Sequence, residues 1–167
     1  HLARRWAGVI AHPVCRVLTN AGAKHLYLGG RKENGPDLQR WYDLARAAAF
    51  FNAFKGANAP FIAIENPIPH SHARALIGAA TQYVQPWWFG DPAFKATGLW
   101  LSGLPPLVAT NRLDPPKPGT DDHKRWSFIH RMPPGPDREE KRSNTFPGLA
   151  NAMADQWGGW AMERVAA

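Results

Sequence analysis

Cys15 and Glu65 are the two residues whose types and positions most clearly predict chemistry. Cys15 is the only cysteine among 167 residues and follows the apolar residues 9–11 after a short His-Pro-Val segment. Glu65 directly follows the apolar residues 61–64. A thiolate can form a covalent bond to an electrophilic carbon, and a carboxylic acid can donate a proton to the atom that gains charge. The pair therefore predicts covalent catalysis assisted by a proton donor.

Two strands joined by one helix are expected to position these residues. Residues 6–11 and 61–65 are apolar enough for buried strands, and Asp37 is expected to cap a helix that runs to about Lys55. Residues 12–36 contain several Gly and Pro breakers and are predicted to form a long loop. Because a helical crossover makes such strands parallel neighbours, both reactive side chains should face one pocket at the carboxyl edge of the sheet.

The remaining segments complete a predicted α/β fold. A short helix is expected at 72–80, strands at 82–85 and 98–101 with the second antiparallel to its neighbour, and a closing helix at 147–157. Residues 103–142 hold eight of the sixteen prolines and are predicted to be an extended, basic surface excursion. We expect a Rossmann-like mixed sheet with flanking helices, incomplete at its N-terminal end. A single domain over 1–167 would contain a sheet core (1–102), the excursion (103–142) and a closing motif with its helix (143–167).

Composition and charge narrow the class of protein. With 44% hydrophobic and 20% charged residues the chain should be globular, and no run of 18 apolar residues predicts a membrane span. No signal peptide pattern is visible, and a lone cysteine fits a reducing compartment, so we expect a cytoplasmic protein.

The net charge of +7 is concentrated in the first third of the chain. Residues 1–56 carry nine Lys or Arg and three acidic residues. A basic surface beside a reactive thiol favours a polyanionic substrate such as DNA over a merely soluble basic face. The expected phosphate contacts are Arg16, Lys24, Arg31 and Lys32.

Four short motifs follow one another along the chain. They are His12-Pro13-Val14-Cys15, Glu65-Asn66-Pro67, the segment 89–97 with Gly90-Asp91-Pro92 and Lys95, and Ser143-Asn144-Thr145-Phe146-Pro147. Their order resembles that of the motifs of the C5-cytosine DNA methyltransferases, in particular the short phage-type members. Val14 takes the place of the usual proline before the cysteine. Of the family's Gln-x-Arg-x-Arg motif only a basic middle residue remains, Lys95, with Ala93 and Thr97 beside it.

The resemblance implies a role for each matching residue. Cys15 would add to C6 of a cytosine flipped out of DNA, and Glu65 would hold the N3 edge of the base and supply a proton there. Lys95 would hold O2 of the base or orient the cysteine loop. The protein would then be a DNA (cytosine-5-)-methyltransferase in a bacterial or phage-infected cell, with S-adenosylmethionine as methyl donor. The donor site would include Pro13, Asn144 and Thr145.

Departures from the family leave alternatives open. Residues 1–14 contain no Phe-x-Gly-x-Gly turn, on which the family builds much of its donor site. A further segment or a second chain is therefore expected to complete that site. The same fold without methyl transfer would be a nucleic-acid-binding module. The shortness of residues 103–142 also permits an enzyme that modifies a free pyrimidine nucleotide.

Several candidate residues also have a purely structural interpretation. A lone cysteine is often a small core residue, and Glu65 at a strand end can be a surface residue or a helix cap. His70 and His72 are expected to be polar loop residues, and no metal site is predicted. Trp87 and Trp88 are expected in the core, with the lining of a base pocket as the alternative.

Overall fold

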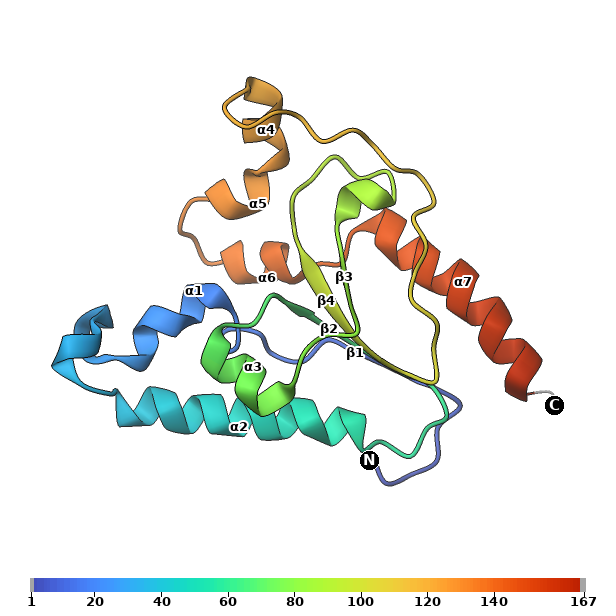
Figure 1. Ribbon diagram of the computed structural model, residues 1–167, viewed down its shortest axis with the longest axis horizontal. Coiled ribbons are helices and arrows are strands. Elements are labelled where there is room, and N and C mark those ends of the chain that lie inside the picture. The colour runs from blue at the N-terminus through green and yellow to red at the C-terminus, as the bar shows by residue number, and fades with distance from the viewer. Residues whose placement is uncertain (1, 166–167) are drawn as a thin grey trace. The chain divides into compact units, whose positions relative to one another are not determined.

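The computed structural model of the chain describes residues 2–165 (Figure 1). The chain divides into two compact units. The first consists of His1–Tyr83 and Thr97–Leu104, and the second of Val84–Ala96 and Pro105–Ala167. The prediction of one domain over 1–167 stays a prediction.

A mixed sheet of four strands forms the centre of the first unit. Its strands are β1 (Val9–Ala11), β2 (Ile62–Pro67), β3 (Gln82–Val84) and β4 (Thr97–Ser102), in the order β1-β2-β4-β3. β1 and β2 are parallel neighbours, as the helical crossover predicts, and β4 runs antiparallel to β2. A mixed α/β architecture with flanking helices is thus confirmed. β1 is shorter than the predicted strand over residues 6–11.

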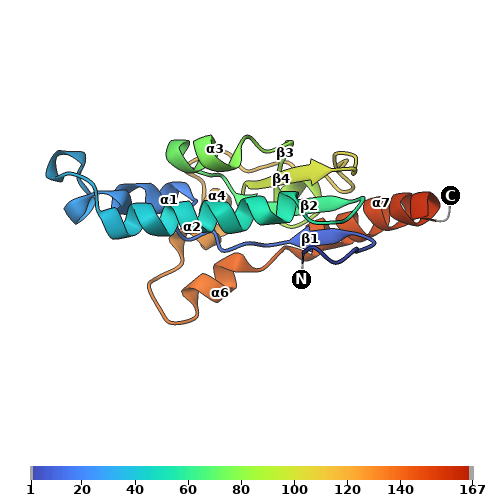
Figure 2. The same cartoon turned by 90° about the horizontal axis from the view of Figure 1, so that it is seen from below.

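Helices α2 (Leu38–Lys55) and α3 (Ser71–Ile77) pack side by side against one face of this sheet (Figures 1 and 2). Asp37 caps α2 by accepting a hydrogen bond from the backbone N–H of Arg40 at 3.2 Å. Burial of the apolar stripe of α2 against β2 and β4 removes Phe51 from solvent, where its ring meets Trp100 edge-on at 4.9 Å. Such an aromatic pair contributes about 0.5–1.5 kcal/mol beyond its buried area.

Strand alternation decides which face of the sheet each residue of β2 occupies. Ile62 and Ile64 join the core beneath α2, so the intervening Ala63 and the following Glu65 project to the opposite face. All four side chains are buried. Glu65 is therefore a buried acid on the face that α2 does not cover.

The predicted long loop over residues 12–36 is wrong in detail. It contains α1 (Asn20–Ala23) and three 3₁₀ turns, η1 (Lys24–Leu26), η2 (Leu28–Gly30) and η3 (Lys32–Asn34). Leu26 is only 1% exposed and anchors the segment in the core. Backbone hydrogen bonds from Leu28 to Gly35 and from Asp37 to Leu26 close it into a compact excursion. The glycines that indicate a loop serve here as turn residues between very short helices.

The second unit is more helical than its proline content predicts. It contains η4 (Pro86–Trp88), α4 (Asp121–Trp126), α5 (Phe128–Arg131), α6 (Arg138–Ser143) and α7 (Pro147–Val165). The extended excursion expected over 103–142 therefore includes three short helices. The hydroxyl of Thr120 caps α4 at 3.2 Å, and ion pairs three residues apart support that helix, which explains why it forms between proline-rich stretches.

Candidate active site at the ends of two parallel strands

The segment that carries Cys15 docks directly onto the Glu-Asn-Pro segment. Because Ala11 pairs with Ile64 in the parallel ladder, the next residues, His12 and Glu65, meet on one face of the sheet. Nδ1 of His12 lies 3.1 Å from Oε2 of Glu65. One residue further, the buried side-chain amide of Asn66 donates to the carbonyl of Pro13 at 3.0 Å.

The other side of the cysteine loop is held by the residues that lead into α3. The carbonyl of Cys15 accepts hydrogen bonds from the backbone of Leu18 and Thr19 at 2.9 and 3.1 Å, which makes a tight turn after the thiol. His70 donates from its backbone to Leu18 at 3.0 Å and from its ring to the carbonyl of Val17 at 2.9 Å. The half-buried Cys15 therefore lies in a loop with hydrogen bonds to the Glu65–His70 stretch on both sides.

Glu65 and His12 together reach from the protein interior to solvent. The side chain of Glu65 is 7% exposed and that of His12 is 45% exposed. Among the described side chains, the His12 imidazole is the hydrogen-bond partner shown for the Glu65 carboxylate. A buried acid beside a half-exposed imidazole can exchange its proton with water through the ring. Sequence analysis missed His12, although the parallel register places it beside Glu65.

His70 acts as a fixed structural group. Its Nδ1 accepts a hydrogen bond from the backbone N–H of Ala73 and so caps α3, which leaves the proton on Nε2 for the bond to Val17. Burial lowers the pKa of His70 below 6.5, the hydrogen bond to Val17 partly opposes that shift, and nearby His72 adds to the lowering. Both ring nitrogens are thus occupied by the backbone.

The second unit brings the other two motifs together. Lys95 is 7% exposed, and its ammonium donates to the carbonyls of Asn144 at 2.8 Å and Ser143 at 3.5 Å. The carboxylate of Asp91 accepts from the backbone N–H of Gly148 at 2.8 Å, at the start of α7. The Gly-Asp-Pro…Lys segment therefore holds the closing motif in place.

The tryptophans before that segment are half-buried. The guanidinium of Arg112 lies 5.0 Å from the centre of the Trp87 ring and 5.2 Å from that of Trp88. This stacking occupies a face of each ring.

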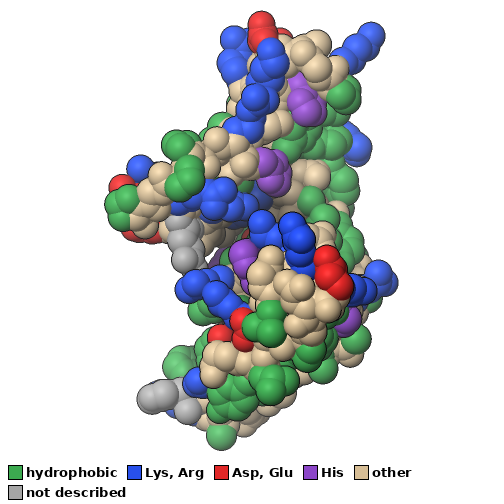
Figure 3. Space-filling model, turned by 90° about the vertical axis from the view of Figure 1, so that its left-hand side faces the viewer, with side chains coloured by type: hydrophobic (Ala, Val, Ile, Leu, Met, Phe, Trp, Pro, Cys, Tyr) green, Lys and Arg blue, Asp and Glu red, His purple; other side chains and the backbone are tan. Residues whose placement is uncertain are grey.

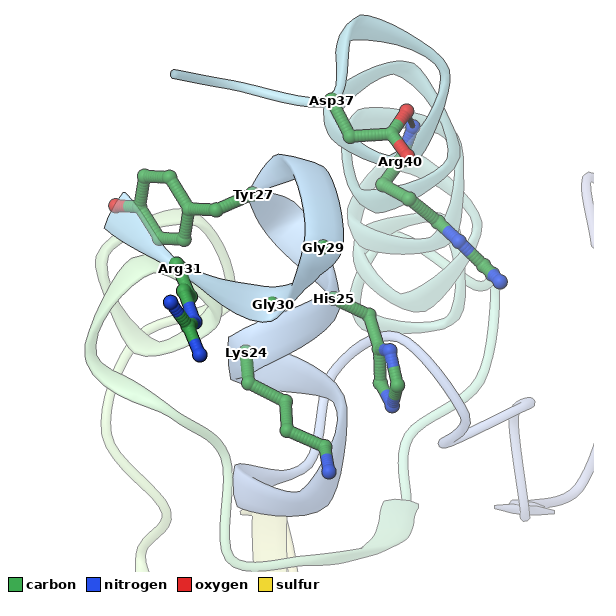
Figure 4. A pocket seen from close by; sticks show the side chains of 8 residues that line it. All are labelled: Lys24, His25, Tyr27, Gly29, Gly30, Arg31, Asp37 and Arg40. Carbon is green, nitrogen blue, oxygen red and sulfur yellow. Dashed lines mark hydrogen bonds between the residues drawn. The ribbon is translucent and has the colours of Figure 1, made fainter. Parts of the chain in front are cut away.

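The four predicted phosphate contacts are all exposed, but they do not form one group. Lys24 and Arg31 line a hollow together with His25 and Arg40, whereas Arg16 and Lys32 are not among its lining residues (Figure 4). Figure 3 shows Lys and Arg side chains, coloured blue, exposed at the surface on the face drawn there.

The residues expected to hold S-adenosylmethionine are divided between the two units, and their role as a donor site stays a prediction. Pro13 belongs to the first unit, and its carbonyl is bound by Asn66. Asn144 and Thr145 belong to the second unit, and the carbonyl of Asn144 is bound by Lys95. None of the three lines the hollow that the structure shows.

Comparison with known proteins identifies no relative. No family model matches the chain, and no curated protein or solved structure matches it. Among the described residues, no helix is long and apolar enough to cross a membrane, and no group of three or more His, Cys, Asp or Glu is placed to bind a metal.

Proposed function

We propose that this protein is a DNA cytosine-C5 methyltransferase, or the catalytic portion of one, with Cys15 as nucleophile and Glu65 as proton donor. The observation that carries the proposal is the docking of the Pro-Val-Cys loop onto the Glu-Asn-Pro segment at the ends of β1 and β2. Two motifs that lie about fifty residues apart are thereby brought to one sheet edge, where α/β enzymes place their reactive groups.

The chemistry requires both side chains. The Cys15 thiolate forms a bond to C6 of a cytosine that has left the base stack, and the π electrons of the ring move through C4 towards N3. Glu65 transfers its proton to N3, so no negative charge accumulates on the base. The neutral adduct carries electron density at C5, the atom that is then methylated. After methylation the N3 proton returns to Glu65. Loss of the C5 hydrogen to solvent as a proton and rupture of the S–C6 bond then regenerate the aromatic ring and the thiolate.

We assign His12 as a positioning residue that acts through Glu65. Glu65 must be protonated before each addition, yet its carboxyl is buried. The half-exposed His12 ring at 3.1 Å connects that carboxyl to water and fixes its orientation. Proton delivery by this route needs no movement of the sheet.

The methyl donor S-adenosylmethionine would supply an electrophilic methyl group to C5. Because Pro13, Asn144 and Thr145 are divided between the two units, we assign no step to it within this chain. In our proposal a further segment or a second chain completes both the donor site and a Rossmann-like sheet, on the outer edge of β1. The protein would act in the cytoplasm of a bacterial or phage-infected cell.

Trapping on 5-fluorocytosine DNA tests the proposal. Fluorine cannot leave C5 as a proton does, so a methylated adduct stays bound to the thiol. With S-adenosylmethionine and a cell extract from the source as supplier of any missing partner, we expect a DNA-linked species that digestion maps to Cys15. The proposal would be contradicted if no species linked to Cys15 forms in an extract that methylates DNA through another protein.

A DNA-binding module without methyl transfer is the second candidate. The basic hollow lined by Lys24, Arg31 and Arg40 favours it. The two candidates separate in the trapping experiment, because a binding module retains DNA without forming any covalent product.

A further inference from the structure

A hollow on residues 24–40 collects basic side chains from two elements. Its volume is about 440 Å³, and its lining includes Lys24, His25, Gly29, Gly30, Arg31 and Arg40. Figure 4 shows Lys24, His25 and Arg31 extending to the same side of the turn that carries the two glycines. Arg40 contributes from the first turn of α2.

The backbone builds this hollow in a defined way. Gly29 and Gly30 both have positive φ angles, of 61° and 75°, which side-chain-bearing residues rarely adopt. They reverse the chain above buried Leu26, and an isolated bridge between Tyr27 and Pro36 closes the base of the excursion. The basic side chains therefore project from an anchored turn, which reduces the entropy lost on binding a ligand.

The charges around the hollow are not balanced by the protein. Among the side chains that the structure describes, no ion pair joins Lys24, Arg31 or Arg40 to an acidic side chain. The one acid in the lining, Asp37, already accepts the backbone N–H of Arg40 as the cap of α2. Figure 4 shows the Arg40 side chain leading away from that carboxylate. Three permanently charged side chains thus line a hollow that an anion can enter.

The chemistry of the lining selects the kind of anion. Guanidinium groups bind phosphate through paired hydrogen bonds, and a lysine adds a point charge. Tyr27 and His25 supply the rings among the lining residues, and Lys32 already covers the Tyr27 ring at 5.9 Å. The lining therefore offers charge for a phosphate and little surface on which a base could stack.

We propose that this hollow is a binding site for a phosphate group of a nucleotide or of a nucleic-acid strand, held by Lys24, Arg31 and Arg40 with His25. The assignment adds Arg40 and His25 to the contacts expected from sequence and excludes Arg16 and Lys32. It does not rest on the chemistry of Cys15, since phosphate binding needs no thiol.

Two probes and two matched double variants test this site. The probes are inorganic pyrophosphate and a short single-stranded DNA, the latter with and without a 5′-phosphate. Lys24→Gln/Arg40→Gln removes two charges from the hollow, while Arg46→Gln/Arg74→Gln removes two exposed charges outside it. Calorimetry at low salt should show pyrophosphate affinity falling about tenfold in the first variant, as expected when one charge-assisted hydrogen bond to the anion is removed. The second variant should lose about twofold or less.

The results separate the source of the phosphate and can overturn the site. If the 5′-phosphate strengthens DNA binding only when the hollow is intact, the site takes a terminal phosphate. If both DNAs weaken equally in the hollow variant, it takes a backbone phosphate. Equal losses in the two double variants, or unchanged pyrophosphate binding in the hollow variant with its unfolding temperature preserved, would show that no phosphate site exists there. None of these readouts depends on methyl transfer.

Discussion

At the scale of single residues, the proposed reaction depends on a thiol and an acid with different surroundings. Cys15 is half-buried in a turn, whereas Glu65 is 6% exposed within β2. A nucleophile needs access to the base, whereas a proton donor needs a fixed position beside the atom that it protonates. The sequence indicated both residues, because each follows an apolar run, but the contact with His12 depended on the strand register.

Replacing the sulfur isolates the covalent step. Cys15→Ser should abolish adduct formation on 5-fluorocytosine DNA and change DNA affinity by less than about threefold, because affinity comes from basic residues. Gel analysis of the adduct and anisotropy of labelled DNA measure the two effects. Adduct formation retained by the serine variant would make the cysteine structural.

The acid and its neighbour should differ in how they affect rate and pH dependence. Glu65→Gln preserves shape but removes the transferable proton, so covalent addition should slow by about 10²- to 10⁴-fold. His12→Gln should slow it much less and alter its pH profile, because the ring only relays the proton. A loss for His12→Gln as large as that for Glu65→Gln, with the pH profile unchanged, would contradict the relay.

At the scale of elements, the cysteine loop depends on α3 for its position. His70 joins the loop carbonyl of Val17 to the N-terminus of α3 only while its ring is neutral. Since burial lowers the pKa of His70 in the folded protein, the unfolded chain binds a proton more readily. This contribution to stability is complete above the unfolded pKa of about 6.5 and is lost as pH falls below it towards the lower folded pKa.

Two substitutions at His70 measure its contribution to stability and to the pH dependence of stability. At pH 7.5, His70→Ala should lower the free energy of unfolding by about 1–3 kcal/mol, through loss of the helix cap and a buried hydrogen bond. His70→Asn can keep the cap and should be less destabilising. Urea titrations between pH 5 and 7.5 should show a weaker pH dependence for both variants than for the wild type. If both variants keep the pH dependence of the wild-type free energy of unfolding, that dependence belongs to a group other than His70.

The start of α7 leaves no room for a side chain at Gly148. A Cβ there would lie 2.1 Å from the carbonyl oxygen of Phe89 and 2.7 Å from the carboxylate of Asp91. Gly148→Ala should therefore destabilise the protein by about 1–3 kcal/mol. Gly158→Ala, in the same helix with open space around it, should be neutral or stabilising by up to about 1 kcal/mol. Thermal unfolding that fails to distinguish the two would contradict the packing of α7 on the Gly-Asp-Pro segment.

Long elements could be predicted from sequence, and short ones could not. The helix from Leu38 to Lys55 has a strong cap, an apolar stripe and a stop at Gly56, and it forms as predicted. The 3₁₀ turns of residues 24–34 and helices α4 to α6 each have few residues and no sustained apolar period. Tertiary contacts such as buried Leu26 decide their structure, and a periodicity argument cannot detect them.

At the scale of the whole molecule, the chain carries a net charge of +7 and divides into two compact units. Each unit joins two of the four motifs through its own hydrogen bonds, from Asn66 to Pro13 in the first and from Lys95 to Asn144 in the second. The composition predicted a basic protein suited to a polyanion, but it could not show which basic residues share a site. That grouping depends on the turn at Gly29 and Gly30.

Cofactor affinity tests the proposed division of the donor site. Residues 1–167 include no Phe-x-Gly-x-Gly turn, and affinity falls about tenfold for each 1.4 kcal/mol by which the binding free energy is weakened. Calorimetry with S-adenosylmethionine should therefore show weak binding or none for this chain alone. Low-micromolar binding would mean that the chain builds the donor site from residues other than Pro13, Asn144 and Thr145.

The central claim is that Cys15 and Glu65 together activate cytosine, and exchange of the C5 hydrogen measures this without any methyl donor. Thiol addition at C6 makes C5 accept a deuteron from heavy water, and elimination then returns cytosine labelled at C5. Mass spectrometry of nucleosides from DNA incubated with the protein should show this label for the wild type, a strongly reduced amount for Glu65→Gln and none for Cys15→Ser. Label that forms equally with Cys15→Ser, or no label with a wild-type protein that binds the same DNA, would contradict the account.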